Sequence, residues 1–97
     1  MLQSRESQDK LVIRFEGSMD SAKCTTIETE VRTAVTEPRM PIVFDLDGVD
    51  FISSAFLRFC IYGQKQAGDH GFQIVNAGPN IKRVFKIAGL DVMLKAD

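Results

Sequence analysis

The 97-residue sequence has few of the residues on which catalytic and metal sites depend. It has a single histidine, His70, and two cysteines, Cys24 and Cys60, which form no C-x-x-C motif and have no zinc-ligand spacing. The phosphate-binding motif G-x-x-x-x-G-K-[ST], the dinucleotide motif G-x-G-x-x-G and the nucleophile motif G-x-S-x-G are all missing. We therefore expect no catalytic residue, no metal and no cofactor, and we expect that the protein is not an enzyme.

Strong net charge and long apolar runs are also lacking. The formal net charge is −1, so no overall basic field favours nucleic acid or an anionic membrane as a partner. No apolar run approaches the roughly 20 residues of a membrane-spanning helix, and the N-terminus lacks the apolar core of a signal peptide. We expect one cytoplasmic domain over residues 1–97 with no nucleic-acid or membrane partner, present as a monomer or weak dimer.

What the sequence does contain is an alternation of strand and helix patterns. Leu11, Ile13 and Phe15 lie on one face of an alternating segment, typical of a half-buried strand that ends at Gly17. Further strands are predicted at 42–46 and 72–75, and short ones are possible at 1–4 and 92–94. Helices are predicted at about 21–36, 54–67 and 79–88. The alternation favours an α/β fold with a mixed sheet of four to five strands and about three helices.

The most informative segment runs from the central strand through Asp47-Gly48, interpreted as a polar turn, to the pair Ser53-Ser54. A serine before an apolar-periodic segment is a helix N-cap signal. The N-terminus of a helix also favours a phosphate, because its free N–H groups and its dipole attract anions. The pair is therefore either a plain cap or a phosphorylation site, at least partly exposed in both cases. Asp45, Asp47 and Asp50 are expected near it as turn formers, where they would make the segment strongly negative.

The helix that follows the serines has an unusual composition. Between Ser54 and Gly63 the only charged residue is Arg58, and apolar residues extend nearly around the helix. A helix on a sheet buries one stripe of side chains. The apolar residues beyond that stripe therefore predict either deep burial of the helix or an exposed patch that binds a partner. Phe56 and Phe59 are the residues for which these alternatives differ most. Cys24 and Cys60 lie on predicted helix faces and are expected to be small buried side chains.

The segment Val49-Asp50-Phe51-Ile52-Ser53-Ser54-Ala55-Phe56-Leu57 resembles the signature of STAS domains, the family of the anti-sigma factor antagonists. The segments Gly71 to Pro79 and Val84 to Asp91 are similar to the end of that family's pattern, and Phe15 to Asp20 resembles its first strand-turn-helix. The resemblance covers nearly the whole chain. Two positions depart from it, because Ser53 stands where the family usually has aspartate and Phe56 where it usually has glycine.

The resemblance implies a regulatory protein-protein interaction module. A GHKL-type serine kinase that is also an anti-sigma factor would be the partner and would phosphorylate Ser54, with Ser53 as the competing acceptor. We expect the partner to contact a set of residues around this serine, namely Asp20, Asp50, Ser53, Ala55, Phe56 and Phe59. The alternative is a divergent STAS module that is not phosphorylated and has a scaffold role or senses a small ligand or nucleotide.

Overall fold

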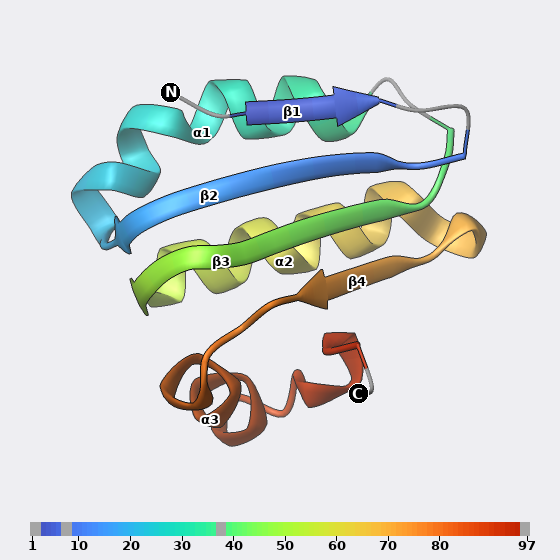
Figure 1. The fold of residues 1–97 in the computed structure, drawn as a ribbon. Helices are drawn as coiled ribbons and strands as arrows, with labels where there is room; N and C mark the ends of the chain where they lie inside the picture. Colours follow the sequence, from blue (N-terminus) through green and yellow to red (C-terminus); the bar gives the residue numbers. More distant parts are fainter. Residues whose placement is uncertain (1–2, 7–8, 37–38, 96–97) are drawn as a thin grey trace.

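The structure, a computed structural model, describes residues 3–6, 9–36 and 39–95. Within these residues the chain forms one four-stranded sheet in the order β1-β2-β3-β4 (Figure 1). The strands are β1 (Gln3–Glu6), β2 (Leu11–Met19), β3 (Ile42–Ile52) and β4 (Phe72–Val75). β1 is antiparallel to β2, whereas β2, β3 and β4 are parallel. The predicted mixed α/β sheet is therefore confirmed; Met1 and Leu2, expected in the first strand, lie outside the described residues.

Three α-helices accompany the sheet in the part of the chain that the structure describes. Helices α1 (Ser21–Thr36) and α2 (Ser54–Ala67) lie side by side on one face of the sheet, and α3 (Pro79–Ile87) lies beyond β4 (Figure 1). Their starts agree with the predicted ones, and α2 also ends at the predicted residue, Ala67, with Gly68 as its C-cap. His70 closes a short 3₁₀ turn, Gly68–His70, that leads into β4 and leaves its side chain exposed.

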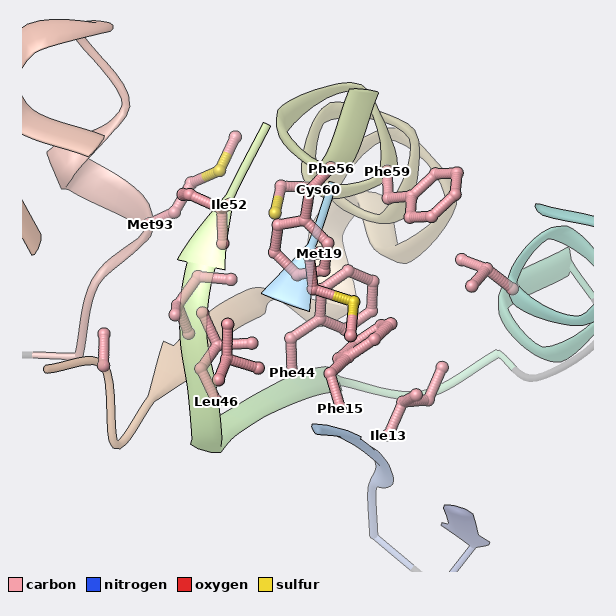
Figure 2. Packing of buried hydrophobic residues seen from close by; sticks show 14 of the residues in the cluster. Ile13, Phe15, Met19, Phe44, Leu46, Ile52, Phe56, Phe59, Cys60 and Met93 are labelled. Carbon is pink, nitrogen blue, oxygen red and sulfur yellow. The ribbon is translucent and has the colours of Figure 1, made fainter. Parts of the chain in front are cut away.

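Most of the core lies between the sheet and the helices α1 and α2, and α3 adds Ile81 and Phe85 to it. Leu11, Ile13 and Phe15 are buried on one face of β2, as their alternation predicts. The ring of Phe15 is edge-on to Phe44 of β3 at a centroid distance of 4.9 Å and to Phe56 of α2 at 5.0 Å (Figure 2). Edge-to-face packing of this kind stabilises aromatic pairs beyond their buried area. These three rings fix α2 against the centre of the sheet.

Two strands are longer than predicted. β2 continues past Gly17 to Met19, and β3 continues through Asp47-Gly48, which is not a turn, to Ile52. The pairing of β2 with β3 shifts between Arg14 and Glu16 and again between Gly17 and Ser18. Gly17 has φ 82°, a conformation that glycine adopts readily, as in a β-bulge. The glycines therefore accompany irregularities within the strands rather than their ends, and β3 leads directly to Ser53.

The C-terminal part also differs from its prediction. Ile81 and Phe85 are the buried residues of α3, and Ala88, which follows its last residue, is exposed although the predicted helix included it. The Leu90 N–H donates to the Phe85 carbonyl at 2.8 Å, and Gly89 has φ 75°, which together form a Schellman cap. The strand expected at 92–94 is instead the 3₁₀ turn Asp91–Met93 with a single bridge from Leu94 to Ile74. Among the described residues, no helix is both long enough and apolar enough to span a membrane.

Candidate functional site

Strands β2 and β3 end side by side, and each continues into a helix. Met19 pairs with Ile52 at the strand ends, and the Ser53 N–H donates to the Met19 carbonyl at 3.0 Å. A single residue, Asp20 after β2 and Ser53 after β3, separates each strand from the helix that follows it, α1 or α2. The N-termini of the two helices are consequently held together at one end of the sheet, and we call the surface around them the serine corner (Asp20, Asp50, Phe51, Ser53, Ser54 and Ala55).

Both helices are capped by side chains at the serine corner. The Asp20 carboxylate accepts a hydrogen bond from the Lys23 N–H at 2.8 Å, and the Ser53 hydroxyl accepts one from the Phe56 N–H at 3.4 Å. Each cap satisfies one of the N–H groups that a helix leaves without a partner in its first turn. The positive ends of two helix dipoles therefore meet here, an arrangement that tolerates an added anion.

The two serines have different environments. Ser53 is half-buried, its hydroxyl is used as the cap of α2, and it lies 3.9 Å from the Cys24 Sγ. Ser54 is the first residue of α2, its side chain is exposed, and its hydroxyl bonds to no other residue that the structure describes. The prediction that both serines are at least partly exposed is confirmed. Of the two hydroxyls, that of Ser54 is the more accessible.

The structure places Phe56 in the core, so the expectation that it contacts a partner is wrong. Its exposed fraction is 0%, and it lies on the helix stripe that faces the sheet together with Phe59, Cys60, Gly63 and Ala67. That stripe follows the spacing i, i+3, i+4, i+7 expected of a helix packed on a sheet. Phe59 is also buried, and only an edge of it lines a groove between the helices. The apolar surplus of α2 therefore reflects deep burial at these two positions.

The other residues predicted to contact the partner, and one that was missed, lie where β2 and β3 end and the two helices begin. Asp20 and Asp50 are exposed, and Ala55 is half-buried. Phe51 is 51% exposed, an unusual state for a phenylalanine, and it pairs with Ser18 near the end of the sheet. The predicted strand ends at Leu46, so Phe51 lies outside it and has no predicted role. Its apolar ring is the largest exposed group of the serine corner, and exposed aromatic residues are enriched at protein interfaces.

A small groove of about 110 Å³ runs between α1 and α2 and includes Ala55, Arg58 and Phe59 in its lining. At its other end the Arg32 guanidinium lies over the Tyr62 ring at 4.8 Å, and the Tyr62 hydroxyl is 3.0 Å from the Thr36 Oγ1. These contacts fix the two helices to each other. The groove continues from Ala55 of the serine corner along the contact between α1 and α2.

Cys24 and Cys60 are both buried, as predicted. Burial raises the pKa of the Cys24 thiol, although a hydrogen bond with Ser53 opposes that shift. Burial also raises the pKa of Cys60, strongly. Because the thiolate is the reactive form, both side chains act as small apolar groups near neutral pH and do not act as nucleophiles.

Two of the three carboxylates expected near the serines are elsewhere. Asp45 accepts hydrogen bonds from the Asp47 N–H and from Asn76 Nδ2, both at 3.0 Å, and Asp47 lies 3.6 Å from Arg14 Nη2. Asp45 precedes the end of β3 at Ile52 by seven residues, which is roughly 23 Å along an extended strand at about 3.3 Å per residue. Only Asp20 and Asp50 remain as acidic groups at the serine corner. Over the described residues, no three His, Cys, Asp or Glu side chains cluster in a way that could hold a metal ion.

Comparison with known proteins identifies relatives over most of the chain. The model of a family described as "Mlab, STAS domain" matches residues 2–95. A protein of Bordetella bronchiseptica named as an anti-sigma factor antagonist, BtrV, is 31% identical over 81 residues, which are 81% of this chain and 70% of that protein.

Solved structures of anti-sigma factor antagonists have the same fold. One from Mycobacterium paratuberculosis matches with a TM-score of 0.84 and 24% identity, over 100% of this chain and 86% of that one. SpoIIAA matches at 18% identity in both of its forms. The unphosphorylated form matches with a TM-score of 0.82 over 98% of this chain and 86% of that one. The phosphorylated form, from Bacillus, matches with a TM-score of 0.73 over 98% of this chain and 89% of that one. With the family match spanning nearly all of its residues, this chain belongs to the STAS domain family.

Proposed function

We propose that this chain is a cytoplasmic anti-sigma factor antagonist. Its partner is an anti-sigma factor that is also a GHKL-type serine kinase and that binds at the serine corner. Phosphorylation of Ser54 causes the partner to dissociate from this surface. The role is supported by the relative BtrV, which is named for it, and the phosphorylation by the existence of a phosphorylated form of SpoIIAA. Ser54 is proposed as the phosphorylated residue, in preference to Ser53, because its side chain is exposed at the start of α2. The Ser53 hydroxyl already caps the helix.

A phosphate on Ser54 would change the surface and leave the fold intact. A phosphoserine adds about −1.5 to −2 charge at pH 7. The first turn of α2 and the adjacent start of α1 accommodate that charge, because both helix dipoles have their positive ends there. The exposed carboxylates of Asp20 and Asp50 add to the negative charge at the same corner. A partner that packs closely against this surface therefore loses affinity.

The test is a comparison of Ser54→Asp with Ser54→Ala in binding to a purified anti-sigma factor encoded near the gene, measured by isothermal titration calorimetry. We expect Ser54→Ala to bind as the wild type does, and Ser54→Asp to bind at least about tenfold more weakly, a difference of about 1.4 kcal/mol. Asn80→Asp is the matched control, because it adds the same charge to the first turn of α3, where Asn80 is exposed.

The serine corner itself is tested by two further variants. Phe51→Ala removes the exposed ring, and a central contact of an interface typically costs 2 kcal/mol or more, about 30-fold in affinity, when truncated. Asp50→Asn removes one charge without changing size. Unchanged binding in Ser54→Asp would contradict the switch, and unchanged binding in Phe51→Ala would contradict the location. A wild-type chain that binds none of the candidate anti-sigma factors would favour the scaffold or ligand-sensing alternative.

A further inference from the structure

Positive charge is concentrated at the C-terminal end of the described chain. The whole sequence has a net charge of −1, but residues 79–95 contain four cationic side chains, Lys82, Arg83, Lys86 and Lys95, and one anionic side chain, Asp91. All five line one open depression of about 700 Å³ between α3 and the 3₁₀ turn that follows it. We call this surface the basic end. The net charge of −1 for the whole sequence conceals this local excess, so net charge alone predicts no membrane partner.

Two aliphatic side chains are exposed on the same α3–3₁₀ unit. Ile87, the last residue of α3, is 79% exposed, and Val92 in the 3₁₀ turn is 80% exposed. They are the most exposed large apolar side chains among the described residues. On α3, Ile87 follows Arg83 by four positions, so the two lie on the same side of the helix, next to Lys82 and Lys86. The buried side of α3 is formed by Ile81 and Phe85.

The composition of the basic end distinguishes between two kinds of acidic partner. The core of a protein interface is enriched in aromatic residues, methionine and arginine and depleted in lysine. The basic end has three lysines, one arginine and isolated aliphatic side chains, and its one aromatic residue, Phe85, is fully buried. Flexible lysine stems interspersed with protruding aliphatic groups fit the headgroup layer of a membrane, which presents diffuse negative charge and admits small apolar groups at its boundary.

The basic end lies at the border of the molecule. Figure 1 shows α3 and the C-terminal turn beyond the edge strand β4, away from α1. A flat surface can approach this unit without displacing the helices that cover the sheet. The residues of the basic end are also separate from those of the serine corner, so a contact here does not use the proposed partner surface.

From these observations we propose that the basic end binds the surface of an anionic phospholipid membrane, with Lys82, Arg83, Lys86 and Lys95 attracted to the headgroups and Ile87 and Val92 inserted at the boundary. The contact is peripheral and reversible. Each cation near an anionic membrane strengthens binding by about fivefold, the equivalent of about 1 kcal/mol. The proposal is independent of the role at Ser54, because it rests on different residues.

The experiment is co-sedimentation of the full chain with sucrose-loaded vesicles of phosphatidylcholine containing 30% phosphatidylserine, against vesicles of phosphatidylcholine alone. The charge variant is Arg83→Gln with Lys86→Gln, and the matched control is Arg39→Gln with Lys65→Gln, which removes two exposed cations elsewhere. We expect the wild type and the control to sediment only with the anionic vesicles, at low salt. The charge variant should bind about 25-fold more weakly, from two losses of about fivefold each.

The apolar contribution is tested by Ile87→Ser with Val92→Ser, which should weaken binding by about tenfold or more, since each inserted methylene contributes about 0.8 kcal/mol, or fourfold. Circular dichroism confirms that each variant is folded. The proposal is overturned if the wild type stays in the supernatant with anionic vesicles, or if the control loses as much binding as the charge variant. Retention of the wild type on immobilised polyglutamate without vesicle binding would also overturn it, and would indicate an acidic protein instead.

Discussion

Truncating Phe56 is the sharpest test of how α2 is attached to the sheet. The side chain is fully buried and lies among three other rings, with centroid distances of 5.0 Å to Phe15, 6.1 Å to Phe59 and 6.3 Å to Phe44. Phe56→Ala removes the ring and leaves a cavity that these neighbours cannot fill without moving. Such changes cost about 3–5 kcal/mol. A domain of this size has a total stability of about 5–15 kcal/mol, so the variant loses a large part of it.

The assay is urea and thermal unfolding followed by circular dichroism, because the chain has no tryptophan. At about 4–8 °C per kcal/mol for a domain of 60–100 residues, the midpoint temperature should fall by at least about 12 °C. Phe51→Ala is the matched control: Phe51 is 51% exposed, so its truncation should cost within about 1 kcal/mol. Equal losses in the two variants, or a loss below about 1 kcal/mol for Phe56→Ala, would refute the assignment of Phe56 to the core.

Two further predictions concern α2. Gly63→Ala should lower the free energy of unfolding in urea by about 1–3 kcal/mol, although alanine has the better helix propensity. The reason is that the added Cβ would lie 2.8 Å from Phe72 Cε1 and 3.3 Å from Phe44 Cζ. A more stable variant would contradict this packing. Burial raises the pKa of the Cys60 thiol in the folded state above its ordinary value of 9.0. Above about pH 9 the unfolded state therefore releases a proton that the folded state keeps. The stability of the wild type should therefore fall with rising pH more steeply than that of Cys60→Ala, by up to about 1.4 kcal/mol per pH unit. Parallel pH profiles would show that the Cys60 thiol is not protected from titration.

The helices could be predicted from the sequence because their signals are local. Ser53 and Ser54 indicate the start of α2, and Gly68 its end, within a few residues of chain. The strand ends could not be predicted in the same way. Glycine is typical of turns, but Gly17 and Gly48 both occur inside strands where the β2–β3 pairing is irregular. A glycine in a bulge and a glycine in a turn look alike in sequence, because only the neighbouring strand distinguishes them.

The candidate site was predictable in its position and less so in its composition. The exposed Ser54 at the start of a helix follows from the capping pattern, and the structure confirms it. The burial of Phe56 depends on Phe15 and Phe44, which come from strands distant in sequence, so composition alone left two alternatives open. The exposure of Phe51 depends on how far β3 extends, and the predicted strand ends at Leu46 whereas β3 continues to Ile52.

The central claim, that Ser54 is the residue through which the serine corner is switched, is tested most directly by locating the phosphate. The wild-type chain is incubated with ATP and the purified GHKL-type kinase encoded near its gene, and the modified residue is identified by tandem mass spectrometry. Ser54→Ala and Ser53→Ala are treated in parallel. The account predicts one phosphate on Ser54 in the wild type and in Ser53→Ala, and none in Ser54→Ala. Phosphate on Ser53, or no phosphate on the wild type, would contradict it.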